Sequence, residues 1–296
     1  MLQRSPTYVV SRPAEDGVAN FMRKILPNKM AYGLTRWKNV LMQLFFYRMT
    51  RVRPNKVKEQ LIGMVEEELG PDYDVETHFT PDYNPWDQRL CLVPDSDLFV
   101  ALKEKKASVV TDHIDRFTET GILLKSGETL DADLIITATG LDLLWLGGMQ
   151  LAVDGVPQQP NELINYRGAM VSNVPNMTSV FGYTNASWTL RADLTSEYFC
   201  KVIRHMDKNG YVEARPVAED VGETSDFLDF SSGYVQRAMQ RFPKRAEKAP
   251  WLMTQNYARD IFLMRHGKVE DGALQFRKAG EAVRATREAA LAIAAE

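Results

Sequence analysis

The run Leu-Ile-Ile-Thr-Ala-Thr-Gly at residues 134–140 constrains the fold more than any other part of the sequence. It contains β-prone and small side chains, carries no charge, and ends at Gly140. A continuous apolar run of this length, bounded by a glycine, is typical of a strand buried on both faces of a parallel sheet. Asp142 and two later glycines interrupt the apolar region that follows. We therefore predict a strand and a turn there, and no transmembrane span.

Composition bounds the class of protein. The chain has 296 residues and a net charge of -3, which suits one large or two ordinary domains and argues against a surface built throughout for nucleic acid. Two cysteines, Cys91 and Cys200, cannot form a disulfide framework, so we expect a reduced, cytoplasmic protein. The first residues lack the apolar segment and cleavage site of a secretory signal.

Positive charge is concentrated in the first part of the chain. Residues 1–60 carry twelve basic and three acidic side chains, a local excess of nine positive charges. Such a region attracts anions, whether cofactor phosphates or lipid headgroups, although basic helix faces are also common on ordinary surfaces. Aromatic residues such as Trp37 and Phe45 lie among the bases. Peripheral membrane contact through residues 34–58 is one interpretation, and simple packing is the other. We expect no nucleic-acid partner, because the rest of the chain is net negative.

Hydrophobic periodicity indicates a mixture of helices and strands. Apolar residues of the first helical region recur every three or four positions, and Pro54 interrupts it. A helix over 188–209 is expected to end at Asn209-Gly210. The expected elements in chain order are a strand over 2–10, helices within 14–69 including one over 56–69, a polar loop over 72–97, a helix over 97–103, a strand over 108–111, a hairpin over 114–133, the buried strand over 134–140, a strand within 174–187 that enters the helix over 188–209, helices over 233–241 and 255–266, and an Ala-rich helical tail from Glu281.

Several catalytic signatures are missing from the sequence. The four histidines are widely separated and neither cysteine has a paired spacing, so we expect no metal site. The nucleophile elbow, the zinc-protease motif and the P-loop are also missing, which argues against hydrolases and P-loop enzymes. No G-x-G-x-x-G occurs, so the usual dinucleotide fingerprint is missing as well.

One short segment nevertheless suits a dinucleotide site. Arg4 and Ser5 follow the first apolar residues, and an arginine just beyond the second strand of a βαβ unit is where the 2′-phosphate of NADP is bound. A guanidinium and a hydroxyl are suitable ligands for that phosphate. The alternative is that Arg4 is an ordinary solvated side chain at the end of a strand.

The segment LDADLIITATGLD, residues 130–142, resembles the end of the pyridine-nucleotide domain of flavin-dependent monooxygenases, the group with the Baeyer–Villiger and N-hydroxylating enzymes. In that family an Ala-Thr-Gly ends the strand that returns the chain from the NADPH domain to the FAD domain. The resemblance implies that Thr139 and Gly140 lie at a cofactor, where glycine permits close approach of the backbone. The motif is short and also fits a plain buried strand.

A second segment, residues 174–194, is similar to the last FAD-contacting turn of the same family, which runs from a strand into a helix. The resemblance implies that backbone N–H groups at the start of this helix face the pyrimidine edge of the flavin, where negative charge develops on reduction. An ordinary capped core helix is the alternative. The implied flavin-binding residues are Thr184, Asn185, Ala186, Ser187, Trp188 and Thr189.

The loop over residues 81–99 looks like the stretch that carries the active-site arginine of Baeyer–Villiger enzymes, and the matching position is Arg89. The resemblance implies that Arg89 stabilises the flavin peroxide and the negative charge of the intermediate that follows. The structural alternative is that Arg89 pairs with Asp87 or Asp95 and holds the loop in place.

The resemblance extends over nearly the whole chain and implies an α/β fold. The expected architecture is an incomplete flavoprotein with two Rossmann-like domains for FAD and NAD(P), a helical insertion and a helical C-terminus. The implied divisions are the remainder of the NADPH-binding domain over 1–136 with the insertion at about 14–70, the C-terminal part of the FAD-binding domain over 137–210, and a mostly helical extension over 211–296. Relatives carry their glycine fingerprints before the counterpart of Leu2, so we interpret the chain as the C-terminal part of a longer enzyme.

The function implied is an NADPH- and FAD-dependent monooxygenase that inserts one atom of O2 into a ketone or a soft heteroatom through a C4a-peroxyflavin. The alternative is a non-catalytic, truncated flavoprotein module that acts through protein–protein association, since apolar surface exposed by truncation favours association. The partners expected are a small organic substrate and O2, and association into oligomers is left open.

Overall fold

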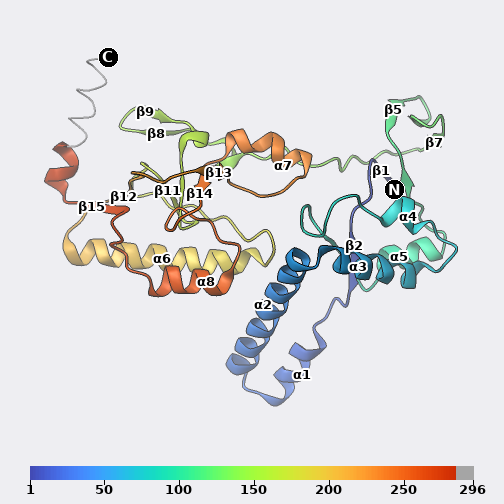
Figure 1. Cartoon of the computed structure of the whole chain (residues 1–296), viewed down its shortest axis with the longest axis horizontal. Helices are drawn as coiled ribbons and strands as arrows, with labels where there is room; N and C mark the ends of the chain where they lie inside the picture. Colours follow the sequence, from blue (N-terminus) through green and yellow to red (C-terminus); the bar gives the residue numbers. More distant parts are fainter. Residues whose placement is uncertain (285–296) are drawn as a thin grey trace. The chain divides into compact units, whose positions relative to one another are not determined.

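The computed structural model describes residues 1–284, and the chain divides into two compact units, Met1–Gly140 and Leu141–Glu296 (Figure 1). Each unit mixes helices with short strands, which confirms the α/β class. None of the helices within residues 1–284 has the length and apolarity that a membrane crossing requires. The expected Ala-rich tail begins at Glu281 and lies mostly outside the described residues.

Short strands and one hairpin make up the β structure of unit 1. β1 and β4 pair in parallel, as do β2 and β3, and β5–β6–β7 form the antiparallel hairpin expected over 114–133. The expected strand over 2–10 is thus two strands separated by residues 4–8. The strands are β1 (Leu2–Gln3), β2 (Val9–Arg12), β3 (Cys91–Pro94), β4 (Val110–Thr111), β5 (Ile114–Phe117), β6 (Gly121–Leu124) and β7 (Thr129–Asp131).

The helices of unit 1 begin and end where the sequence gives a physical reason. Asp16 caps the first helix by accepting a hydrogen bond from the backbone N–H of Ala19 at 3.1 Å. Pro54 occupies the first turn of α3, and Gly70, with φ of 84°, ends it. The helices are α1 (Gly17–Ile25), α2 (Asn28–Val52), α3 (Pro54–Leu69), α4 (Val75–Phe79) and α5 (Asp97–Lys103).

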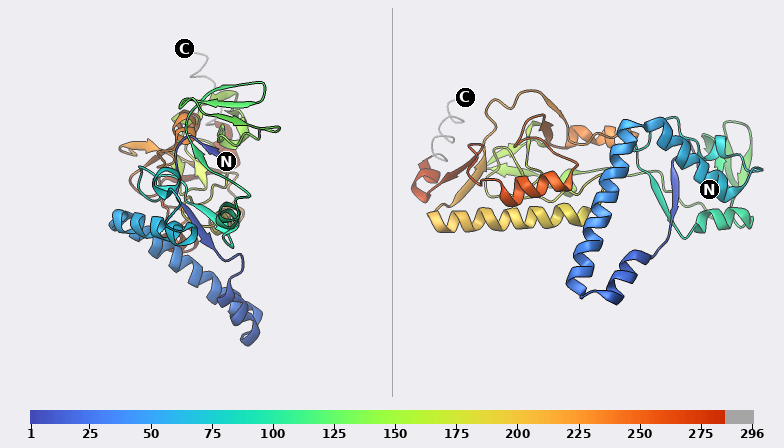
Figure 2. Two further views of the ribbon diagram at one scale, coloured as in Figure 1. Left: turned by 90° about the vertical axis from the view of Figure 1, so that its right-hand side faces the viewer. Right: turned by 60° about the horizontal axis from the view of Figure 1, so that its bottom comes forward.

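The core of unit 1 lies between β2 and helices α3, α4 and α5. Its buried side chains form two clusters, one with Val9, Val65, Val75, Phe79, Phe99, Leu102 and Val109, and one with Tyr8, Val10, Val57 and Leu61. Helices α1 and α2 supply no fully buried residue to either cluster. In Figures 1 and 2 these two helices form a hairpin that extends away from α3, α4 and α5.

The expectation of a buried strand at residues 134–140 is wrong. These residues form no strand, and the side chains of Leu134 and Ile136 are 77% and 82% exposed. A strand buried on both faces needs paired neighbours and a cover on each side, and no strand among residues 1–284 pairs with this run.

Unit 2 contains four two-stranded antiparallel sheets and one long helix. Its strands are β8 (Leu151–Val153), β9 (Val156–Gln158), β10 (Asn165–Tyr166), β11 (Met170–Val171), β12 (Glu213–Pro216), β13 (Thr224–Asp226), β14 (Lys244–Ala246) and β15 (Leu274–Arg277). Its helices and helical turns are η1 (Trp145–Gly148), η2 (Pro160–Glu162), α6 (Trp188–Asn209), α7 (Gly233–Ala238), η3 (Met239–Arg241), α8 (Tyr257–Ile261) and η4 (Phe262–His266). The helices expected over 233–241 and 255–266 are present, whereas β8–β15 were not expected. The strand expected within 174–187 is wrong, because those residues form no strand.

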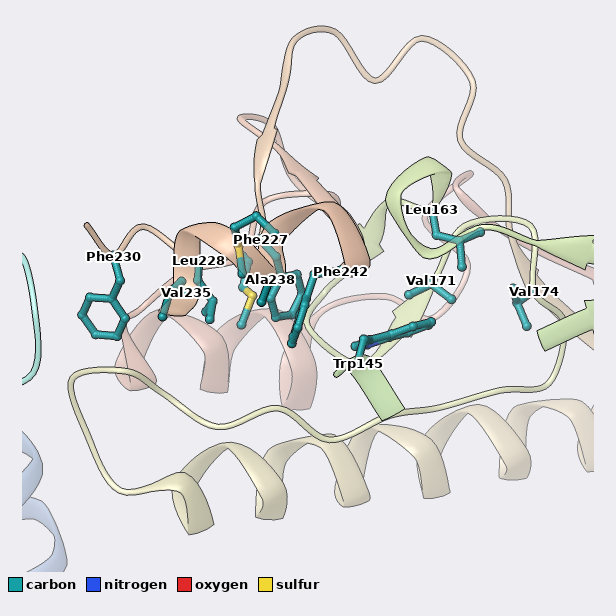
Figure 3. Close-up of a cluster of buried hydrophobic side chains, with 12 residues drawn as sticks. Trp145, Leu163, Val171, Val174, Phe227, Leu228, Phe230, Val235, Ala238 and Phe242 are labelled. Carbon is teal, nitrogen blue, oxygen red and sulfur yellow. The ribbon is translucent and has the colours of Figure 1, made fainter. Parts of the chain in front are cut away.

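The long helix α6 occupies the residues that its periodicity predicts, 188–209, and Gly210 ends it with φ of 68°. It buries one continuous face. A hydrophobic cluster in the same unit includes Trp145, Phe227 and Phe242 (Figure 3). Phe181 packs against this cluster and meets Phe227 edge to face at 4.9 Å between ring centroids.

Candidate functional site

The turn that enters α6 requires a glycine. Gly182 lies directly under the indole of Trp188, and a Cβ added at Gly182 would overlap that ring. The same indole packs against Phe181 at 5.1 Å between ring centroids. The backbone before α6 is therefore held close to the first residue of the helix, because no larger side chain fits there.

Gln255 fixes the next two residues of the turn. Its Oε1 accepts hydrogen bonds from the backbone N–H of Thr184 at 2.9 Å and from the Thr184 hydroxyl at 3.2 Å. Its carbonyl accepts a bond from Nδ2 of Asn185 at 2.9 Å. A chain segment about seventy residues away in sequence thus holds the turn in a single conformation, which is the preorganisation that a binding site needs.

The start of α6 is left without a side-chain cap. Ser187 occupies the N-cap position, but its hydroxyl bonds the hydroxyl of Thr189 at 2.8 Å instead of a backbone N–H. Asn185 is buried, and its Oδ1 has no hydrogen-bond partner within the described residues. Free N–H groups at the positive end of a 22-residue helix, beside an unused acceptor, can bind a group that carries negative charge and also donates one hydrogen bond.

A buried ion pair between α6 and α8 stabilises the turn. Arg191, on α6, donates to Asp260, on α8, and both side chains are almost inaccessible to solvent. Asp260 also accepts bonds from the hydroxyls of Tyr183, at 2.6 Å, and of Thr254. Burial raises the pKa of Asp260, while Arg191 and the two hydroxyls act in the opposite direction. This network ties Tyr183, the residue after Gly182, to the centre of unit 2.

Arg191 is enclosed on its other side by backbone. Its Nη2 donates to the carbonyl of Arg167 at 3.1 Å, and a Cβ added at Gly168 would overlap the guanidinium. Arg167 in turn pairs with Asp271 at 2.7 Å, and Asp271 accepts from Tyr166 at 2.9 Å. Burial raises the pKa of Tyr166 far above its ordinary value, so the phenol stays protonated and donates.

In unit 1 the structure joins the segment after Arg4-Ser5 to the loop that carries Arg89. The Thr7 hydroxyl donates to the carbonyl of Arg89 at 3.4 Å, and Tyr83 donates to Thr7 at 2.9 Å. Arg4, Ser5 and Arg89 are all exposed. Two nearby carboxylates have partners of their own: Asp87 pairs with Arg51 at 2.8 Å, and Asp95 accepts from the backbone of Ala14 at 3.0 Å.

The remaining sequence-predicted residues fall outside regular structure. Thr139 and Gly140 are exposed, and Gly140 has φ of 109°, a conformation that favours glycine. The predicted residues therefore divide between the units, with Arg4, Ser5, Arg89, Thr139 and Gly140 in unit 1 and 184–189 in unit 2. Within residues 1–284, no three His, Cys, Asp or Glu side chains are placed to hold a metal ion.

Sequence reasoning missed Gln255, Asp260 and Arg191. Arg191 had a signal, because it follows Leu190 and precedes Leu194 by three positions, which places a charge beside an apolar helix face. A charge there needs a buried partner. Nothing local in the sequence identifies Asp260 as that partner, since it lies 69 residues away.

No family model matches the chain. Among curated proteins, the chain is 49% identical over 281 residues to the FAD-containing monooxygenase EthA of Mycobacterium tuberculosis, an alignment that covers 94% of this chain and 57% of the relative. It is 45% identical over 285 residues to the probable FAD-binding monooxygenase AlmA of Acinetobacter baylyi, covering 96% and 57%. It is 42% identical over 286 residues to the putative FAD-containing monooxygenase MymA of Mycobacterium tuberculosis, covering 95% and 57%.

The fold is similar to that of a solved structure described as oxidised steroid monooxygenase bound to NADP. The TM-score is 0.64 at 14% identity, over 94% of this chain and 62% of that one. The chain thus spans a little over half the length of the curated relatives it matches. The resemblance drawn from residues 130–142 and 174–194 is confirmed, and over the part of their length that it spans the chain is a relative of the FAD-containing monooxygenases.

Proposed function

We propose that this chain takes part in an NADPH- and FAD-dependent monooxygenation, in which one atom of O2 enters a ketone or a soft heteroatom of a small organic substrate. The observation that carries the proposal is the turn over 184–189, which offers an uncapped helix start and the unused Oδ1 of Asn185 in a chain 49% identical to an FAD-containing monooxygenase. We divide the chain for this function as 1–136 for NADPH, 137–210 for FAD and 211–296 as an extension.

The donors and acceptors at the start of α6 fit the pyrimidine edge of a flavin. That edge has carbonyl oxygens that accept hydrogen bonds and one N–H that donates. Backbone N–H groups of Trp188 and Thr189 are suitable donors, and Asn185 Oδ1 is a suitable acceptor. Thr184 and Asn185 are fixed by Gln255, so the turn binds without further ordering. When bound, FAD supplies the hydride-accepting and oxygen-activating chemistry. Thr139 and Gly140, which are exposed, are proposed to contact a cofactor.

Arg4, Ser5 and Arg89 are proposed to serve the nicotinamide side of the reaction. Arg4 and Ser5 would bind the 2′-phosphate of NADPH with a guanidinium and a hydroxyl. The exposed guanidinium of Arg89 would stabilise negative charge that develops at the reacting oxygen atoms. The hydrogen bonds through Thr7 and Tyr83 fix the backbone of both segments relative to each other, so one cofactor can contact them together.

Binding of FAD to the purified chain is the first test. Titration with FAD, followed by quenching of flavin fluorescence, is expected to saturate. Asn185→Leu is expected to weaken binding about tenfold through loss of the acceptor Oδ1 and of the Nδ2 hydrogen bond that fixes the turn to Gln255. Asn161→Leu, at an exposed asparagine on η2 of the same unit, is the control for the loss of an asparagine outside the turn. A chain that shows no saturable binding, or equal losses in both variants, contradicts the proposed flavin site.

Product formation tests the arginines. With FAD, NADPH, isotopically labelled O2 and either a ketone or a thioether, Arg89→Met is expected to lower oxygen incorporation about a hundredfold. Arg4→Gln is expected to raise the KM for NADPH and leave the KM for NADH unchanged, because NADH lacks the 2′-phosphate. Arg116→Met, an exposed arginine paired with Asp115, is the control for both. Equal KM changes for the two nucleotides would remove Arg4 from the phosphate site.

A second candidate function is association as a non-catalytic module. The observation that favours it is the exposed apolar run with Leu134 and Ile136. Light scattering on the purified chain is expected to show oligomers that Leu134→Gln with Ile136→Gln converts to monomers. A wild-type monomer rules this function out.

We also propose a cytoplasmic location, which suits the free thiols of Cys91 and Cys200, with peripheral contact to a membrane surface through residues 34–58. Retention of both thiols in the reduced state in cells is the measurement that checks the location.

A further inference from the structure

Helix α2 carries an apolar stripe along one exposed face. Met30, Leu34, Leu41, Phe45 and Val52 are spaced by four, seven, four and seven residues, so they fall on one side of a helix with 3.6 residues per turn. Every one of these side chains is at least half exposed, and Trp37, between Leu34 and Leu41 on the same face, is also exposed. The stripe spans almost the whole length of α2.

Helix α1 continues this apolar character. Val18, Phe21 and Ile25 recur at spacings of three and four residues and are all exposed. A single exposed leucine needs no explanation. Apolar faces on two consecutive helices expose more apolar surface together than soluble proteins usually leave in contact with water.

The hairpin is held in shape without burying these faces. Asp16, at the start of α1, accepts hydrogen bonds from Lys38 at 2.6 Å and from Asn39 at 3.3 Å on α2. Thr35 donates to the sulfur of Met22 at 3.6 Å. These hydrogen bonds join α1 to α2, and no stripe residue takes part in them.

The charge on this hairpin is of one sign. Helices α1 and α2 together carry seven basic residues and no acidic one. Lys38 pairs with Asp16 and Arg51 pairs with Asp87, while the basic residues with exposed side chains include Arg23, Lys24, Lys29, Arg48 and Arg53. Arg48 lies within the stripe, between Phe45 and Val52, where a long side chain can extend its charge to a polar boundary while its stem stays on the apolar side.

We propose that the α1–α2 hairpin docks flat on an anionic phospholipid surface, with the stripe of α2 in the acyl boundary and the basic residues at the headgroup phosphates. This inference deepens the membrane contact proposed above by naming the residues and the lipid charge, and it does not depend on flavin binding. Charge complementarity selects this occupant. A second copy of the hairpin would bring seven like charges against seven, whereas an anionic membrane offers both an apolar layer and opposite charge.

Flotation with vesicles tests the proposal on the full chain without added flavin. The chain is expected to float with vesicles of phosphatidylcholine and phosphatidylglycerol at low salt, and only weakly with phosphatidylcholine alone or at high salt. Leu41→Gln with Phe45→Gln is expected to lower the partition coefficient at least tenfold. Lys29→Gln with Arg48→Gln is expected to lower it roughly fivefold for each charge removed.

Phe262→Gln is the matched control, because Phe262 on η4 is 69% exposed and Phe45 is 68% exposed. It is expected to bind vesicles as the wild type does. The proposal is overturned if the wild type ignores anionic vesicles, or if Phe262→Gln loses as much binding as the stripe variant. It is also overturned if the stripe variant converts a dimer into a monomer on a sizing column while the wild type binds no lipid. Failure of FAD binding leaves every one of these results unchanged, so the two proposals fail separately.

Discussion

Helices α2 and α6 have similar length and similar spacing of apolar residues, yet they use those residues in opposite ways. The 22 residues of α6 bury a continuous face that includes Leu190, Leu194, Tyr198 and Val202. The 25 residues of α2 bury only Ala31, Val40 and Thr50, and the apolar stripe points to the outside. Hydrophobic periodicity therefore identifies a helix with an apolar face, and what covers that face is a separate question.

The difference follows from what surrounds each helix. α6 has partners on its apolar side, since α8, η4 and β12 belong to the same unit and Asp260 neutralises Arg191 on that side. α2 is joined to α1 by hydrogen bonds from Lys38 and Asn39 to Asp16, and its Phe46 and Met49 pack against a core cluster of unit 1. We infer that α6 contributes to the free energy of unfolding, while α2 contributes to binding outside the fold.

The largest effect is expected at the charge pair of α6. Arg191→Met leaves the carboxylate of Asp260 buried without its partner, which is expected to cost about 3–5 kcal/mol in the free energy of unfolding of unit 2. Urea unfolding followed by circular dichroism measures it. The control is Arg241→Met, whose ion pair with Asp142 is exposed and whose loss is expected to change little. A stable Arg191→Met variant would show that α6 is not anchored as described.

The comparison itself is tested by one substitution made on both helices. Leu194 is fully buried and Leu41 is exposed. Leu194→Ala is expected to lower the free energy of unfolding by about 2–5 kcal/mol because it leaves a cavity. Leu41→Ala is expected to change it by less than about 0.5 kcal/mol. Equal losses in the same urea experiment would mean that the face of α2 is covered within the fold.

Glycine substitutions sharpen the same contrast with smaller effects. Gly168→Ala places a methyl group against the Arg191 guanidinium, at a residue with φ of 67°, and is expected to cost about 1–3 kcal/mol. Gly33→Ala lies in α2, where an added Cβ meets nothing within 4 Å. It is expected to stabilise the chain by about 0.5–1 kcal/mol through helix propensity. Thermal unfolding of both variants is the measurement, and a loss at Gly33 would contradict the open surroundings of α2.

The smallest effect is a pH dependence at the base of the hairpin. The hydrogen bond from Lys38, followed by that from Ala19, lowers the pKa of Asp16 from 3.8 to about 2. Because the folded pKa lies below the ordinary one, the contribution of Asp16 is complete above about pH 4 and is lost as the pH falls toward 2. Titration of the Asp16 carboxyl by NMR checks this. Lys38→Met is expected to raise its pKa, and an unchanged midpoint would show that Lys38 is not the cause.

The sequence predicted the boundaries of helices well where a single residue, such as a glycine or a proline, determines where the helix begins or ends. Gly210 ends α6, Pro54 begins α3, and the hairpin β5–β7 lies where the sequence predicts it. The site was predicted by family resemblance at residues 184–189, but Gln255 and Asp260, which hold that turn, are brought there only by tertiary folding. The prediction of a buried strand at 134–140 was wrong for the same reason that periodicity does not predict the exposed face of α2. An apolar sequence pattern does not show whether another part of the chain packs on the apolar side chains.

Hydrogen–deuterium exchange of the full chain, with and without vesicles that contain phosphatidylglycerol, tests the central contrast most directly. Backbone amides of residues 17–52 are expected to exchange more slowly when vesicles are present, because lipid covers the faces of α1 and α2. Amides of 188–209 are expected to exchange at the same rate in both conditions, because the face of α6 is already covered inside unit 2. Unchanged exchange over 17–52, or equal slowing over 188–209, would contradict the assignment of the two helices to opposite roles.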